Sequence, residues 1–412
     1  MLGLAAVAAV MTPNTAAAGA EALASVTSDE LGAVHVSAAN GRAVYLNQID
    51  VLGVLQQQTQ LISQQQGLIQ DLEARDSQQA AQISALHEQV CSSNRPSLTT
   101  IQVADDNSNK WRGGVLAPNG LIYGVPALAI SVLIINPISG TADTTTISGL
   151  ARNVNKWSSG VLAPNNIIYC FPYDASSVLK IDPSMNTADT TSITLNPTSG
   201  MFSSSVLANN GRVYGIPFRS SSVLAIDPDT DNVNFIGLGF YDTDTSRWNS
   251  GALGPDGRIF CLPYYSNVLL IIDPATDGVS FVTLTLPPNQ NGWVSTTLAN
   301  NGLMYSIPSV GSSMLVLNPA TTQVEYLDLP DVDLDWQGAV LAPNGKIYSA
   351  PYLSRSVLVL DPSTNATDST TFAMQDATTN GHLFSGAVLG NDGRIFAIPF
   401  SADHVLVINP GC

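Results

Sequence analysis

An aromatic residue returns at nearly constant intervals along most of this chain. The interval lies between about 43 and 48 residues, which is longer than the repeats of stacked solenoids. The seven aromatic positions are Trp111, Trp157, Phe202, Trp248, Trp293, Trp336 and Phe384. A proline follows each aromatic after a short apolar run, and an Asp-Pro or Asn-Pro pair closes each unit. Three sequence features, the aromatic, the proline and the closing pair, therefore each occur seven times in the same order, which indicates seven copies of one structural unit.

Each copy predicts four β-strands, and residues 336–362 show the pattern clearly. The run GAVLAP ends in a Pro-Asn-Gly turn, whose Asn and Gly tolerate the positive φ of a hairpin. KIYSAPY follows, and then SVLVLDP, whose proline cannot continue a central ladder. A Thr-rich or alternating run supplies the fourth strand, expected at residues 144–147, 190–195, 233–238, 279–284, 324–329 and 369–374.

The last copy ends at Pro410 without a fourth strand, and a matching segment stands upstream of the first copy. Residues 98–103 read LTTIQV, similar to the fourth-strand runs TTTIS and TTSIT. We expect this strand to complete the last unit, because closing the ring removes the exposed strand edges. The fold class is therefore predicted as all-β: a seven-bladed β-propeller of four-stranded blades over residues 98–412.

The repeat resembles the seven-bladed β-propellers of the NHL and WD40-like superfamily. The resemblance rests on the three repeated columns and covers about three quarters of the chain. It implies a ring of blades around a central channel, with no room for a second globular domain.

Three segments precede the propeller. Residues 1–24 contain an apolar run followed by small residues, though no basic residues precede it. This pattern indicates a signal peptide, and with it an extracellular or cell-surface location; an Ala-rich tail is the alternative, and cleavage is left open. Residues 25–47 alternate in polarity and are expected to form a short hairpin turning at Asn40–Gly41. No other stretch is long and apolar enough to span a bilayer, so no membrane span is expected in the mature chain.

Residues 48–91 form the only segment with a helical pattern. Apolar residues recur every seven positions at Leu55, Ile62, Ile69, Ile83 and Val90, while glutamines and leucines alternate three positions further on. This heptad predicts a parallel coiled-coil stalk that makes the chain a homo-oligomer. Ile with Leu favours a dimer and the glutamine layers also suit a trimer, so both oligomers remain open. The alternative is a single amphipathic helix packed on the propeller.

The four cysteines fall into two pairs of different character. Cys91 precedes the closing strand and Cys412 follows the last one, so antiparallel pairing of those strands would bring the two together. We predict a disulfide there, which would hold the ring closed. Such a bond implies that the protein resides in an oxidising compartment. Reduced thiols are the alternative. Cys170 and Cys261 occupy one column of small residues and are expected to be buried, free thiols.

Charge and motifs argue against several classes of function. The net charge is −17, which disfavours nucleic acid and anionic membrane surfaces as partners. The expected inner strands, such as SGVLAP and GAVLAP, carry no acid and no histidine. His382 and His404 are the two propeller histidines and are expected to be packing or surface residues. No nucleophile elbow, metalloprotease helix or phosphate loop is present. We therefore expect no enzyme activity, no metal and no cofactor.

Aromatic and charged residues near one rim of the ring are the candidates for ligand binding. The loops before the first strand and after the second should share one face. The candidates there are Trp111, Trp157, Trp248, Trp293, Trp336, Tyr173, Asp174, Arg219, Tyr264, Tyr265, Tyr352, Arg355 and Asp403. Aromatics beside polar groups could stack on sugars or anchor a protein. An aromatic repeated in every blade, however, more often packs between blades. Asn365 begins the sequon Asn-Ala-Thr in a predicted exposed loop and is a candidate N-glycosylation site.

These features together predict a secreted or surface-displayed oligomer whose propeller heads bind a glycan or a protein partner. A stalk that joins several heads would raise avidity without any new contact. A structural subunit of an extracellular fibre, appendage or virion spike is the main alternative. An enzyme of the lactonase or lyase kind is a third interpretation, disfavoured by the inner strands.

Overall fold

The computed structural model describes residues 24–28, 34–38, 45–46, 49–105, 107–152, 155–196, 200–239, 246–287, 291–310, 312–329, 335–374 and 381–411. The chain divides into two compact units, residues 1–90 and residues 91–412.

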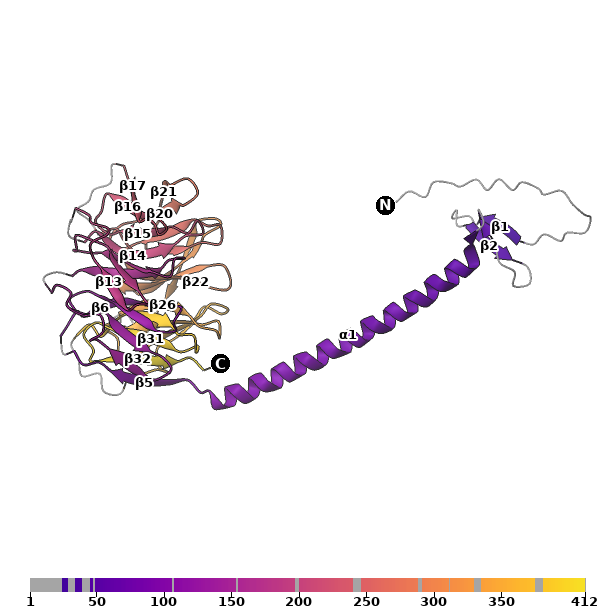
Figure 1. Cartoon of the computed structure of the whole chain (residues 1–412), viewed down its shortest axis with the longest axis horizontal. Helices are drawn as coiled ribbons and strands as arrows, with labels where there is room; N and C mark the ends of the chain where they lie inside the picture. The colour runs from indigo at the N-terminus through magenta and orange to yellow at the C-terminus, as the bar shows by residue number, and fades with distance from the viewer. Residues whose placement is uncertain are drawn as a thin grey trace, which may run out of the picture. The chain divides into compact units, whose positions relative to one another are not determined.

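Seven four-stranded antiparallel sheets form the second unit and stand as the blades of a ring (Figure 1). The innermost strands are β6 (Trp111–Leu116), β10 (Trp157–Leu162), β14 (Phe202–Leu207), β18 (Trp248–Leu253), β22 (Asn291–Leu298), β26 (Trp336–Leu341) and β30 (Phe384–Leu389). The second strands are β7 (Ile122–Pro126), β11 (Ile168–Pro172), β15 (Val213–Pro217), β19 (Ile259–Pro263), β23 (Met304–Val310), β27 (Ile347–Pro351) and β31 (Ile395–Pro399). The predicted seven-bladed β-propeller is thereby confirmed.

The third and outer strands complete each blade. The third strands are β8 (Leu133–Asn136), β12 (Leu179–Asp182), β16 (Ser222–Asp227), β20 (Val268–Asp273), β24 (Ser313–Asn318), β28 (Leu358–Asp361) and β32 (His404–Asn409). The outer strands are β9 (Thr141–Asp143), β13 (Thr187–Asp189), β17 (Asn232–Gly237), β21 (Gly278–Thr283), β25 (Gln323–Asp328), β29 (Ala366–Asp368) and β5 (Ser97–Gln102). We number the blades 1 to 7 in the order of their inner strands.

Blade 7 takes its outer strand from the other end of the repeat region. The order is β30-β31-β32-β5, with His404 opposite Gln102 and Asn409 opposite Ser97. The closing strand expected from the sequence is therefore confirmed. Cys412 and the side chain of Cys91 lie outside the described residues, so their disulfide stays a prediction.

The outer strands of blades 1, 2 and 6 differ from expectation. They begin earlier than predicted and contain only three residues each. In blade 1 the Thr-rich run instead folds around Asp143, whose carboxylate accepts bonds from the backbone N–H and hydroxyl groups of Thr145 and Thr146. Such local bonds compete with a β-ladder and end it early. Asp189 and Asp368 do the same in blades 2 and 6, and these bonds hold the pKa of both carboxyls, as of Asp143, at about 2.

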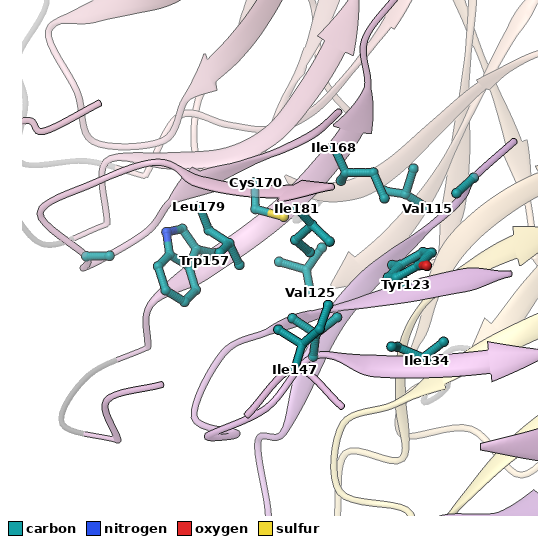
Figure 2. Packing of buried hydrophobic residues seen from close by; sticks show 13 residues of the cluster. Val115, Tyr123, Val125, Ile134, Ile147, Trp157, Ile168, Cys170, Leu179 and Ile181 are labelled. Carbon is teal, nitrogen blue, oxygen red and sulfur yellow. The ribbon is translucent and has the colours of Figure 1, made fainter. Parts of the chain in front are cut away.

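The hydrophobic core lies between neighbouring blades. Figure 2 shows the cluster between blades 1 and 2, where Trp157 packs with Val125 of one blade and Leu179 of the other. The indole Nε1 of each tryptophan donates to a backbone carbonyl at the start of the third strand of its own blade, for example Trp157 to Ser177 at 2.8 Å. The repeated aromatic therefore fills the gap between sheets and also satisfies its one polar group.

Hydrogen-bonded clamps join each blade to the next at the rim opposite the tryptophans. In blade 1, Asn119 Nδ2 donates to the Pro183 carbonyl of blade 2 and to the hydroxyl of Tyr123, both at 2.9 Å. Tyr123 in turn donates to Asn186 at 2.6 Å. The same Asn–Tyr pair recurs at Asn165–Tyr169, Asn210–Tyr214, Asn301–Tyr305 and Asn344–Tyr348. Each hairpin turn thus fixes the spacing between two blades.

Blades 4 and 7 replace the clamp with different chemistry. There the tyrosine is a phenylalanine, Phe260 or Phe396, which has no hydroxyl. An arginine donates to the carbonyl of the next blade instead. The guanidinium of Arg258 donates to the Pro319 carbonyl at 3.3 Å, and that of Arg394 donates to the Pro137 carbonyl at 2.6 Å. An aspartate replaces the asparagine and holds each guanidinium within 2.6 Å. Although these residues differ from those of the other blades, blades 4 and 7 keep a hydrogen bond to the carbonyl of the next blade.

Removing one clamp hydroxyl is expected to weaken the ring. Tyr169 donates to Asp231 at 2.9 Å and accepts from Asn165, so Tyr169→Phe leaves both partners short of a bond. We expect the free energy of unfolding, measured in urea, to fall by about 1–2 kcal/mol. Tyr173→Phe, whose hydroxyl has no hydrogen bond among the described residues, is the matched control and should change it by less than about 0.5 kcal/mol. Equal stability of the two variants would contradict the clamp.

The described residues of the first unit form two short hairpins and most of one long helix. Strands β1 (Ala24–Ser28) and β2 (Val34–Ala38) pair, as do β3 (Tyr45–Leu46) and β4 (Ile49–Asp50). The pairing of β1 with β2 gives a hairpin within the segment where one was expected, whereas the predicted turn at Asn40–Gly41 and residues 1–23 lie outside the described residues. Helix α1 (Val51–Ser93) follows and confirms the predicted helix. In the described part of the chain, no helix has both the length and the apolar character that a membrane crossing requires.

Helix α1 exposes a row of large apolar side chains. These are Val54, Leu55, Leu61, Ile62, Leu68, Ile69, Leu72 and Ile83. Leu55, Ile62, Ile69 and Ile83 are the predicted heptad positions. Val54, Leu61 and Leu68 each precede one of them and widen the apolar stripe beyond what the heptad alone predicts.

Candidate ligand-binding site in the central channel

A polar pocket of about 370 Å³ opens at the centre of the ring, at the rim where the inner strands begin. All seven inner strands contribute to its wall. The residue directly after the repeated aromatic lines it in every blade: Arg112, Ser158, Ser203, Asn249, Val294, Gln337 and Ser385. Behind this layer lie glycines and the hydroxyls of Ser159, Ser204, Ser250, Ser295 and Thr296. The wall therefore presents mainly hydroxyl and amide groups.

Many of these hydroxyls also join the blades. Ser158 donates to the Phe202 carbonyl of the next blade, and Ser203 donates to the Trp248 carbonyl of the one after. Ser385 donates to the side-chain oxygen of Gln337 at 2.9 Å. The polar wall is consequently rigid, because its groups are positioned by bonds across the blade boundaries.

Four aromatic rings surround the mouth of the pocket. They are Tyr173, Phe218, Tyr264 and Tyr352, each of which follows the proline that ends a second strand. We call these four residues the aromatic crown. Neighbouring rings touch: Tyr173 to Phe218 and Phe218 to Tyr264 both have centroids 5.7 Å apart. The crown gives the pocket an aromatic rim above a polar wall.

The crown column has no aromatic in blades 1 and 5. Blade 1 has Ala127 there, and the guanidinium of Arg112 lies over the rings on either side, 5.2 Å from the centroids of Tyr173 and Phe400. Blade 5 has Ser309, whose hydroxyl lies 3.4 Å from the carboxylate of Asp335. Each of these two small residues thus lies beside an ionisable side chain, Arg112 in blade 1 and Asp335 in blade 5.

Asp335 is a buried carboxyl that accepts few hydrogen bonds. It is 7% exposed, and its Oδ1 has no hydrogen-bond partner among the described residues. Its backbone carbonyl accepts from Tyr352, Leu353 and Ser354 at 3.0 to 3.2 Å, which fixes the residue in place. Burial raises the pKa of Asp335 to about 7, only partly opposed by the bond from Ser309. The carboxyl is therefore largely protonated in mildly acidic solution.

His382 lies beside this mouth, where its ring stacks on Tyr352 with centroids 4.2 Å apart. Burial, and secondly the positive charge of Arg112, lower the pKa of His382. Burial raises the pKa of Tyr352. Near neutral pH, both rings at this edge of the crown are therefore uncharged.

The structure separates the sequence-predicted binding residues into two groups. Tyr173, Tyr264 and Tyr352 line the pocket together, as expected for that loop. The five tryptophans do not, because their side chains are at most 4% exposed within the core between blades. A buried indole cannot stack on a ligand. The alternative interpretation, that one aromatic per blade packs between sheets, describes Trp111, Trp157, Trp248, Trp293 and Trp336.

The remaining candidates lie outside the pocket wall. Tyr265 is half exposed and touches Tyr264, with centroids 4.2 Å apart. Arg219 lies over Phe218 and donates to Ser246. The carboxylate of Asp174 accepts from the backbone of Gly200. Arg355 is exposed, and Asp403 pairs with its neighbour His404 at 2.6 Å.

The small-residue column and the sequon lie where the sequence indicated. Cys170 and Cys261 are free and fully buried, and burial raises the pKa of both thiols. Asn365 is exposed in the turn between β28 and β29, and its Oδ1 accepts from Tyr305. Among the described residues, no group of three His, Cys, Asp or Glu side chains is placed to hold a metal ion.

Sequence reasoning missed Arg112, Phe218, Asn249 and Gln337. For Arg112, Asn249 and Gln337 the signal was the position after the repeated aromatic, which changes from blade to blade while its neighbours repeat. For Phe218 it was the position after the repeated proline, the column that already held Tyr173, Tyr264 and Tyr352. A search for acids and histidines passed over these residues. Variation inside a repeat marks a position that packing does not dictate.

Comparisons with known proteins support the fold alone. No family model matches the chain, and no curated protein matches it. The chain is similar to the solved structure of a streptogramin B lyase, with a TM-score of 0.62, 15% identity and coverage of 76% of this chain and 97% of that one. A catalytically inactive virginiamycin B lyase from Staphylococcus aureus with quinupristin gives a TM-score of 0.64 at 11% identity, covering 76% and 99%. The extracellular domain of a putative hybrid two-component system from B. thetaiotaomicron gives 0.59 at 10% identity, covering 76% and 40%. At such identities these structures show that the chain is a β-propeller.

Proposed function

We propose that this protein is an extracellular, non-catalytic binding protein that holds a carbohydrate in its central pocket. The observation that carries the proposal is the pairing of the aromatic crown with a wall of hydroxyl and amide groups. Sugars combine apolar C–H faces with a dense set of hydroxyls. The crown offers rings for those faces, and Ser, Thr, Asn and Gln offer both donors and acceptors.

Rigidity supports the same proposal. The wall hydroxyls are held by bonds across blades, as in Ser158 to Phe202. A preformed site avoids the entropic cost of ordering side chains when the ligand arrives. The volume of about 370 Å³ lies within the range of small-molecule sites.

Binding to a glycan array and calorimetry of the strongest sugars would test this proposal. Tyr264→Ala removes one crown ring and should weaken sugar binding about tenfold or more, as for other aromatic anchors. Phe235→Ala removes an exposed ring from the outer strand β17 and is the control, with unchanged binding expected. An array without any bound glycan would overturn the proposal and favour a protein partner or a structural subunit.

Several heads on one stalk would strengthen such binding. We propose that α1 assembles two or three chains through its apolar stripe. Among the described side chains of α1, eight large hydrophobic ones are exposed, a row that a single helix leaves in water. A bundle of two or three helices would bury this row. Linked heads then gain avidity for repeated sugars on a surface.

Light scattering of the full chain tests the assembly. The wild type should show two or three times the chain mass, and Ile69→Asp should shift it toward one chain. The reason is that an aspartate in the seam buries an unpaired charge. Gln60→Asp places the same charge on the opposite side of the helix, among Gln56, Gln57, Ser63 and Gln64, and should leave the mass unchanged. A wild-type mass of one chain would exclude the stalk.

A further inference from the structure

Arg112 differs in kind from its counterparts in the other six blades. The position after the repeated aromatic holds Ser, Asn, Val or Gln elsewhere, all uncharged. Among the described residues that line the pocket, Arg112 of blade 1 alone carries a positive charge. The same blade has Ala127 in the crown column, so no ring covers the space that the arginine side chain occupies.

Two rings hold the guanidinium without neutralising it. Its central carbon lies 5.2 Å from the ring centroids of Tyr173 and Phe400, a geometry that favours a cation. Within the described residues, Arg112 has no ion pair and no hydrogen bond from its side chain. A guanidinium carries five N–H donors in a fixed fork, so its donors remain available to the pocket.

The charge of Arg112 acts on the pocket mouth. It contributes to lowering the pKa of His382 and opposes the burial that raises the pKa of Tyr352. The chain as a whole carries a net charge of −17, so a positive wall is opposite in sign to the rest of the molecule. Asp335, which lies beside Ser309 in the crown column, has a raised pKa of about 7, so its carboxyl is largely uncharged in mildly acidic solution.

We infer that the central pocket selects acidic sugars, and that Arg112 binds their carboxylate. This inference rests on the proposed carbohydrate function and names its ligand class. The fork of a guanidinium matches the two oxygens of a carboxylate, which a neutral sugar lacks. The crown and the wall hydroxyls then contact the ring of the same sugar. Arg112 is thus the specificity residue, and the crown supplies affinity shared by neutral and acidic sugars.

Matched sugars test the inference. Calorimetry would compare oligomers of galacturonate, oligomers of glucuronate and glycans ending in N-acetylneuraminate with the carboxyl-reduced form of each. The wild type should bind at least one acidic sugar ten times or more tighter than its reduced partner, and added salt should shrink that ratio. Arg112→Gln should lose the ratio while keeping the affinity for the reduced sugar. Lys346→Gln removes the same charge at the opposite rim and should keep the ratio.

The outcomes separate the inference from the function beneath it. Equal binding of each acidic sugar and its reduced form by the wild type would overturn the role of Arg112 and leave carbohydrate binding intact. Absence of binding to every sugar in both forms would overturn both. The wild-type comparison needs no variant, so a misfolded Arg112→Gln protein would not hide either result.

Discussion

Gly386→Ala is expected to lower the free energy of unfolding by about 3 kcal/mol or more, because two separate costs add. Gly386 adopts a φ of 91°, which side chains rarely accept. A Cβ there would also lie 2.6 Å from the Cα of Gly113 in the next blade. The obstacle is backbone, so no rotamer change can relieve it.

The contact belongs to a series that crosses the junction of the ring. A Cβ on Gly338, in blade 6, would meet the backbone of Gly386 and Ala387 in blade 7 at 2.5 to 2.7 Å. Blades 6, 7 and 1 therefore approach one another backbone to backbone. Gly237→Ala in β17 is the control: its Cβ would meet nothing within 4 Å, and stability should stay equal or rise slightly. Urea unfolding measures both, and equal loss in both would contradict the close contact.

Asp335→Asn is expected to stabilise the protein by up to about 4 kcal/mol above pH 7 and by nothing near pH 4. The folded pKa is about 7, whereas an unfolded aspartate titrates near 3.9. Between these values the folded chain keeps a proton that the unfolded chain releases, so stability falls as pH rises. Above pH 7 the buried carboxylate is charged in the fold, and its full cost is present. An asparagine never incurs that cost.

Unfolding in urea at pH 4, 6 and 8 would measure this effect. Asp403→Asn is the control, because His404 and hydrogen bonding lower the pKa of Asp403 and its charge favours the fold. Its side chain is 72% exposed, so screening keeps the change small and no gain at high pH is expected. A gain for Asp335→Asn that is independent of pH would show that packing, not charge, caused it.

The ring could be predicted from the sequence because repeats constrain one another. The last copy lacks a fourth strand, and residues 98–103 resemble one, so the sequence predicts a ring closed by this strand. The pairing of β5 with β32 confirms that prediction. The outer strands were harder. Asp143 and Thr145 compete with the ladder through bonds that a β-propensity pattern does not register.

The site was only partly predictable. Tyr173, Tyr264 and Tyr352 were assigned to the correct rim because they follow a repeated proline. Arg112 was not, because its partners Tyr173 and Phe400 belong to different blades and meet only when the ring closes. The cause of the raised pKa of Asp335 is burial, which no single blade reveals. Features that form within one blade could be predicted from the sequence, whereas features that form between blades could not.

The closing strand also determines how the head would respond to mechanical load. Three residues separate the end of α1 from the start of β5, so tension transmitted along the helix reaches this edge strand before any other. The ladder from Ser97 to Gln102 would therefore bear the force first, and its loss would open the ring while blades 1 to 6 remain folded. A bond between Cys91 and Cys412 would carry the tension past that ladder to the end of β32. The predicted disulfide would then protect the pairing of β5 with β32 when flow pulls on a head attached to a surface.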